Sequence, residues 1–103
     1  MSDPKTLESA YRQVTQELLD MFLKKHKDYG KGNILSVREL GIALRISEKI
    51  ERIKHMQANG NKPSNESIEE TWIDIANYAV IAILLERGDF ESLDVTKEAM
   101  DNV

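Results

Sequence analysis

The chain has 103 residues, of which 41% are hydrophobic and 31% are charged, with a net charge of -4 and no cysteine. This composition is typical of one small globular domain spanning residues 1–103, and the lack of cysteine excludes a disulfide scaffold and a thiolate metal site. The acidic balance argues against long nucleic acid as a partner. The absence of a signal-peptide pattern and of a bilayer-long apolar run leads us to expect a cytoplasmic protein without membrane contact.

The first predicted helix extends to about Lys27. Ser2 or Asp3 is suited to cap it, and Pro4 is suited to its first turn. Its apolar residues recur at helical spacing along one face, at Leu7, Tyr11, Val14, Leu18 and Met21 or Phe22. Two glycines with Asp28 and Asn33 follow, so residues 26–33 are expected to form a loop.

A second helix is predicted from Ser36 to about Met56, because Ser36 and Glu39 have the spacing of a capping box. Its apolar face carries four isoleucines, Ile42, Ile46, Ile50 and Ile53. Its polar face carries Arg45, Glu48, Glu51, Arg52 and His55. The segment 58–65, which contains Gly60 and Pro63, predicts a second loop.

A third helix is predicted from Glu66 to about Arg87, and its stretch 73–85 is apolar nearly all the way round. Such a helix is central, yet so short a chain has few elements with which to surround it. We therefore expect an all-α fold completed by association into a homodimer or a higher even oligomer. Trp72 and Tyr78 are expected to fill the core or an interface. Gly88 ends the helix, and residues 89–103 have the weak pattern of a short last helix.

Four polar residues of the third helix share one face, within a sector of roughly 80°. They are Glu66, Glu70, Asp74 and Asn77. Like charges at this spacing repel one another, so they need compensation, either by cations of the second helix or by a divalent metal bound to carboxylates of both helices. From spacing alone, a solvated face or a salt-bridge ladder is the commoner explanation of such a row. Glu51 either pairs with Glu48 or faces water.

Three motifs together resemble the nucleotide-modification-associated domain one family of phage and bacterial proteins. They are Lys25-x-x-Asp28-Tyr29-Gly30, Arg45-x-x-Glu48-Lys49-x-x-Arg52 and Glu66-Ser67-x-x-Glu70-x-x-x-Asp74-x-x-Asn77-Tyr78. The family pattern has Asp where this chain has Glu48 and Glu70. The arrangement is more loosely similar to the all-α, MazG-like nucleoside triphosphate pyrophosphatases, although Glu70 and Asp74 are four residues apart instead of three.

The resemblance implies a MazG-like helical bundle and an Mg²⁺-dependent, or Mn²⁺-dependent, hydrolase that converts a nucleoside triphosphate to a monophosphate and pyrophosphate. The implied metal ligands are Glu48, Glu66, Glu70 and Asp74. The implied catalytic residues are Glu48, Glu51, Glu70 and Asp74. The implied nucleotide contacts are Lys25, Tyr29, Arg45, Lys49, Arg52 and Asn77. The alternatives are a noncatalytic nucleotide-binding module and a structural oligomeric protein.

Overall fold

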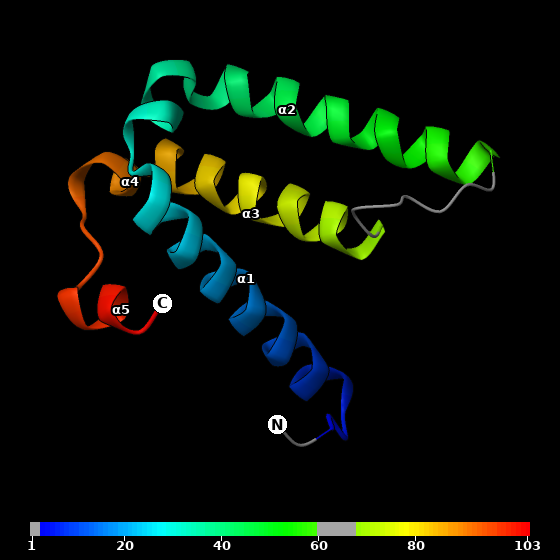
Figure 1. Cartoon of the computed structure of the whole chain (residues 1–103), viewed down its shortest axis with the longest axis horizontal. Coiled ribbons are helices and arrows are strands. Elements are labelled where there is room, and N and C mark those ends of the chain that lie inside the picture. Colours follow the sequence, from blue (N-terminus) through cyan, green and yellow to red (C-terminus); the bar gives the residue numbers. More distant parts are fainter. Residues whose placement is uncertain (1–2, 60–67) are drawn as a thin grey trace. The chain divides into compact units, whose positions relative to one another are not determined.

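The computed structural model describes residues 3–59 and 68–103, and its regular elements within these ranges are all α-helices (Figure 1). The predicted all-α class is therefore confirmed. The chain divides into two compact units, which we term the larger unit, residues 31–94, and the smaller unit, residues 1–30 with 95–103. Among the described residues, no helix combines the length and the apolar content needed to cross a membrane.

The larger unit is built on two long antiparallel helices, α2 (Gly32–Asn59) and α3 (Ile68–Glu86), which lie side by side (Figure 1). The short helix α4 (Asp89–Ser92) follows and packs against α3. Burial of apolar side chains between these helices forms the core. Its buried members are Ile34, Ile42, Ile53, Met56, Ile81, Leu85 and Phe90. The predicted apolar face of the second helix is confirmed, with Ile42 and Ile53 buried and Ile46 and Ile50 half-buried.

The smaller unit consists of α1 (Leu7–Tyr29) and α5 (Lys97–Asp101). Lys27 Nζ donates hydrogen bonds to the carbonyl oxygens of Met100 and Val103, at 3.3 and 3.0 Å. These bonds satisfy main-chain acceptors at the end of α5, which has too few residues to be stable alone.

The cap of α1 differs from the prediction. Thr6 caps the helix, since its hydroxyl accepts from the Ser9 amide while the Ser9 hydroxyl accepts from the Thr6 amide, both at 3.1 Å. This is a reciprocal capping box, with serine in the place usual for glutamate. Asp3 lies outside the helix, so the cap predicted there is wrong, and Ser2 lies outside the described residues.

The connection between α1 and α2 is shorter than predicted. The loop expected over residues 26–33 is wrong, because α1 continues to Tyr29 and α2 begins at Gly32. Gly30 makes the turn with a φ of 67°, a conformation that suits glycine. The helix predicted to start at Ser36 therefore starts one turn earlier, and the Ser36 hydroxyl donates to the Asn33 carbonyl at 2.8 Å instead of capping a helix.

A kink divides α2 near its N-terminus. Arg38 has φ 53° and ψ -153°, a conformation that a residue with a side chain seldom adopts. The kink brings the chain so close to itself that a Cβ added to Gly41 would overlap the Cβ of Val37. Glycine at position 41 is therefore a requirement of this backbone path.

Gly41→Ala should destabilise the protein by about 1–3 kcal/mol, because the added methyl group forces the overlap with Val37 to be relieved by movement of the backbone. Gly32→Ala is the matched control, since a Cβ there meets nothing within 4 Å. We expect that variant to be unchanged or more stable by about 0.5–1 kcal/mol. Urea unfolding followed by circular dichroism measures both, and equal effects would contradict the account of the kink.

Charged side chains surround the kink. Arg38 Nη1 lies 2.8 Å from Glu91 Oε2 of α4, and Arg38 Nε lies 3.2 Å from Glu39 Oε1. The hydrogen bond to Glu91 raises the pKa of Arg38, and the same bond lowers the pKa of Glu91. The pKa of Glu39 is lowered chiefly by its own main-chain amide and also by a hydrogen bond from Glu86. Both carboxylates are thus stabilised in their charged form beside the strained residue.

Glu91→Gln should lower the thermal midpoint near neutral pH, because it removes the ionised partner of Arg38. Because the pKa of Glu91 is lower in the native protein than in the unfolded chain, its ionised carboxylate stabilises the fold. This stabilisation is fully present above the unfolded pKa of about 4.3 and is lost as the pH falls through the native pKa. The difference between the variant and the wild type should therefore shrink when midpoints are measured near pH 3. Glu98→Gln, on exposed α5, is the control; a difference independent of pH would count against the ion pair.

Candidate functional site

Charged side chains of α2 and α3 meet where the two helices pack. Lys49 Nζ donates to Asp74 Oδ2 at 3.1 Å, and the two side chains are only 22% and 20% exposed. Charges that are largely removed from water need a partner of opposite sign, since an unpaired buried charge is costly. The pair therefore joins the helices at a place where neither charge would be stable alone.

A second contact continues the same register. Arg45 lies one turn before Lys49, and its Cζ lies 5.9 Å from the ring centroid of Tyr78, one turn after Asp74. This distance is within the range of a cation–π interaction. In antiparallel helices, a residue one turn earlier on one helix lies opposite a residue one turn later on the other. The Arg45–Tyr78 and Lys49–Asp74 contacts are therefore consistent with the same alignment of α2 and α3. We term Arg45, Lys49, Asp74 and Tyr78 the charged seam.

The alignment also places Arg52 about level with Glu70, one turn further along the pair of helices. Arg52 and Glu70 each have an interaction partner, and so does Asn77. Glu70 is exposed and Asn77 is half-buried. The aligned positions therefore continue beyond the charged seam to Arg52 and Glu70, with the cations on α2 and the acids on α3.

The structure brings together three of the predicted site residues, Arg45, Lys49 and Asp74. Tyr78 was expected to fill the core or an interface, and it is half-buried with the Arg45 guanidinium over its ring. Its sequence signal was the four-residue step from Asp74, which places the two side chains on one face of α3.

The other predicted acidic residues do not join the seam in the same way. Glu48 and Glu51 are exposed, and Glu51 pairs with Lys54 at 3.2 Å on the surface of α2. Glu66 lies outside the described residues. Within residues 3–59 and 68–103, no three acidic or histidine side chains lie close enough together to hold a metal ion. Successive helical residues point about 100° apart, so Glu48 points away from the direction of Lys49.

The carboxylates of α3 are nevertheless of the chemical kind that binds Mg²⁺. Mg²⁺ keeps several waters and commonly takes only one or two protein carboxylates together with substrate phosphates. Asp74 and Glu70, four residues apart on α3, offer two such carboxylates, and Mn²⁺ accepts the same oxygen ligands. These residues fit a metal that arrives with a phosphate ligand better than a preassembled site of three carboxylates.

Two predicted nucleotide contacts, Lys25 and Tyr29, lie on α1 in the smaller unit. Tyr29 is 71% exposed and is the last residue of the helix, so it has the access to solvent expected of a ligand contact. Lys25 is exposed but is not without a partner.

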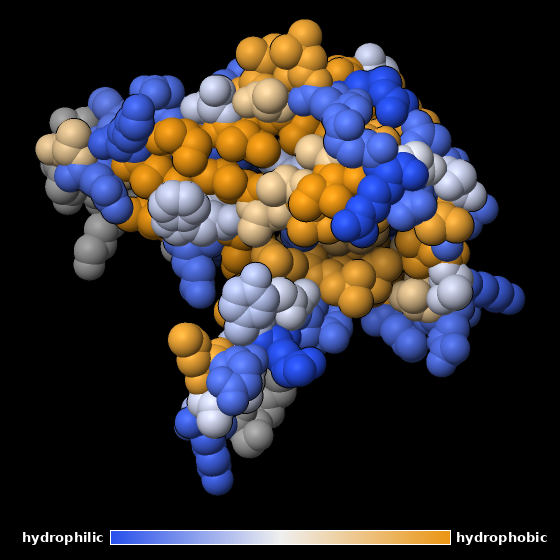
Figure 2. Space-filling model, turned by 180° about the vertical axis from the view of Figure 1, so that it is seen from behind, coloured by the Kyte–Doolittle hydropathy of each residue, from blue (hydrophilic) through white to orange (hydrophobic). Residues whose placement is uncertain are grey.

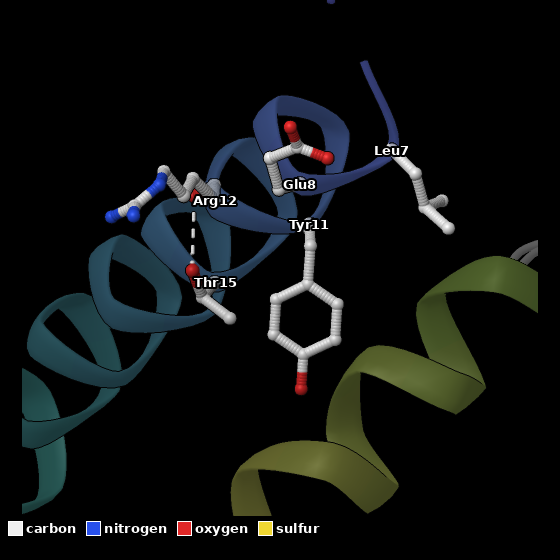
Figure 3. A pocket seen from close by; sticks show the side chains of 5 residues that line it. All are labelled: Leu7, Glu8, Tyr11, Arg12 and Thr15. Carbon is white, nitrogen blue, oxygen red and sulfur yellow. Dashed lines mark hydrogen bonds between the residues drawn. The ribbon is translucent and has the colours of Figure 1, made fainter.

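A shallow, open depression is also found on α1 (Figure 3). Its walls come from the N-terminal turns of the helix, with lining residues Leu7, Glu8, Tyr11, Arg12 and Thr15. The Thr15 hydroxyl is bonded to the Arg12 carbonyl at 3.0 Å (Figure 3). With one acid and one base from a single exposed helix, this surface lacks the convergent polar groups of a ligand site.

Asp74→Asn should destabilise the protein by about 1–3 kcal/mol, because Lys49 would then keep its charge in a poorly hydrated place without an ionised partner. Glu51→Gln breaks the exposed pair with Lys54 and should change stability by less than about 0.5 kcal/mol. Urea unfolding of both variants in parallel tests the difference. A loss no larger for Asp74→Asn than for Glu51→Gln would show that the seam does not hold the helices together.

Comparison with known proteins places this site within a described family. The sequence profile of nucleotide modification associated domain 1 matches residues 25–85, which is more than half of the chain. The match spans α2 and α3 and includes the whole charged seam. No curated protein and no solved structure matches the chain.

Proposed function

Because the chain belongs to the nucleotide modification associated domain 1 family, we propose that it acts on nucleotides and binds their phosphates at the charged seam. The observation that carries this proposal is the largely buried Lys49–Asp74 pair, which keeps an ammonium group at a fixed position between two helices. A fixed cation beside carboxylates is the arrangement in which phosphate and a divalent metal can be bound together. We further propose a cytoplasmic location, where nucleotides are available.

The donors of the seam have capacity for a phosphate ligand. Lys49 carries three N–H groups and uses one of them on Asp74, while Arg45 presents a face to Tyr78 and has five N–H groups directed outward in its plane. Arginine and lysine in this arrangement bind phosphate oxygens by charge-assisted hydrogen bonds. Arg52 extends the row of cations, and Asn77 is proposed to contact the rest of the nucleotide.

The reaction we propose is hydrolysis of a nucleoside triphosphate to a monophosphate and pyrophosphate. Asp74 and Glu70 would hold Mg²⁺ with the substrate phosphates. When bound, the metal would neutralise phosphate charge and make a water molecule more acidic. The protein's own share is to hold the phosphates with Arg45, Lys49 and Arg52 and to accept a proton from water at a carboxylate of α3, for which Glu70 is the candidate.

A noncatalytic nucleotide-binding module is the second candidate. It is favoured by one observation, that no three acidic or histidine side chains are gathered for a metal within residues 3–59 and 68–103. Such a protein would bind the phosphates through the cations of the seam and would need no ordered metal. Self-association into a homodimer is proposed for either function.

The two candidates are separated by measuring pyrophosphate release from each common ribo- and deoxyribonucleoside triphosphate, with Mg²⁺ and with a chelator. The enzyme should release pyrophosphate only with the metal, and Asp74→Asn and Glu70→Gln should each lower the rate about 100-fold or more. Glu98→Gln, remote in sequence and on exposed α5, should retain the wild-type rate.

Isothermal titration with the same nucleotides completes the test. Nucleotide affinity without turnover, unchanged by chelator, would establish the noncatalytic module. An active Asp74→Asn variant that retains its helix content would remove the assignment of the seam, and a protein without affinity for any nucleotide would refute both candidates.

A further inference from the structure

Helix α3 is apolar on two opposite sides, and α2 covers only one of them. Thr71, Ile81 and Leu85 are buried on the covered side. The opposite side, roughly 160° round the helix, is largely exposed even though its centre is apolar. We term it the outer face of α3, and its members are Glu69, Trp72, Ala76, Ala79, Ile83 and Arg87, of which Ala76 is half-buried and the others are exposed.

The exposure is large for side chains of this kind. Trp72 is 49% exposed and Ile83 is 51% exposed, while the neighbouring Val80 is 45% exposed. Hydrophobic side chains accordingly gather at the surface of the larger unit (Figure 2). A contiguous apolar strip bordered by charges is typical of a surface that binds another protein.

We infer that the outer face of α3 binds the outer face of a second copy of this chain, with the two α3 helices antiparallel. Along the helix, the face presents an acid, a large apolar residue, two alanines, a large apolar residue and a base. When two copies of this face run in opposite directions, each large apolar residue meets a large apolar residue, and each acid meets a base. A twofold axis between residues 77 and 78 would bring Ala76 beside Ala79 of the partner subunit, and small residues at the crossing allow the helices to approach closely.

The same axis brings large residues and charges together at both ends. Trp72 would lie beside Ile83 of the partner subunit. Burial of a large aromatic side chain there would contribute much of the binding free energy. Glu69 would lie level with Arg87 of the partner subunit, so that opposite charges border both ends of the contact. Arg87 is still in helical register, since its amide donates to the Ile83 carbonyl at 3.1 Å. In a parallel arrangement, Glu69 would meet Glu69 and Arg87 would meet Arg87.

The size of the contact sets the expected strength. Helix α3 has 19 residues and is therefore about 28 Å long, so one helix pair buries less than the roughly 800 Å² per partner of a standard stable interface. We expect a dimer that dissociates in the micromolar range. This inference concerns the outer face and does not depend on nucleotide binding at the charged seam.

Sedimentation equilibrium of the full chain tests the inference. The wild type should have about twice the chain mass of 11.8 kDa at high micromolar concentration. Ala79→Arg, which changes an exposed residue at the proposed crossing, should give the monomer mass with unchanged helix content. Leu44→Arg, at an exposed leucine of α2, is the matched control and should remain dimeric. A monomeric wild type, or a dimer that withstands Ala79→Arg, would overturn the inference.

Cysteine cross-linking tests the antiparallel alignment, because the chain has no cysteine of its own. Glu69→Cys and Arg87→Cys chains, mixed and oxidised, should form a disulfide-linked dimer joining position 69 to position 87. Each chain oxidised alone should stay largely unlinked, since like positions would be about 27 Å apart. Efficient linkage of either chain by itself would indicate parallel helices, and no linkage in the mixture would place the partner elsewhere; either result overturns the proposed interface.

Discussion

The pair of Lys49 and Asp74 fixes how α2 and α3 lie against each other. Apolar packing holds two helices together but discriminates weakly between alignments, because isoleucine and leucine can pack in several registers. A poorly hydrated charge pair adds a preference for one alignment, since separating Lys49 from Asp74 costs the poorly hydrated charges their contact. With this alignment set, Arg45 comes to lie over Tyr78, and the cations of α2 face the carboxylates of α3. The proposed nucleotide site follows from the same alignment.

Much of the fold could be predicted from the sequence, because helical periodicity reports which side chains are buried. The isoleucines of α2, the long apolar α3 and its end before Gly88 were all identified in this way. The start of α2 was not identified in this way. Ser36 and Glu39 have the spacing of a helix start, but the preceding residues are also helical, and Arg38 takes the kink between them. An arginine with a positive φ has no sequence signal of its own, and the closest indication was Gly41.

The site was predictable in composition but not in detail. Spacing identified the row of acids on α3 and the cations that compensate it. Which residue of α2 faces Asp74 depends on the rotation of that helix, and neighbouring residues differ by about 100°. The structure directs Lys49 to Asp74 and leaves Glu48 exposed, so a cation occupies the position where a second acidic ligand was expected. A metal at this site would therefore depend on phosphate oxygens for part of its coordination.

The position at which a nucleotide binds to the protein tests the charged seam most directly. Amide chemical shifts of the isotopically labelled protein, recorded by nuclear magnetic resonance while a nucleoside triphosphate and Mg²⁺ are added, report which residues change their surroundings. If the nucleotide binds at the charged seam, the largest changes should occur at Arg45, Lys49 and Asp74. Changes confined to the exposed surface of α1, or a spectrum that does not respond to any nucleotide, would contradict binding at the charged seam.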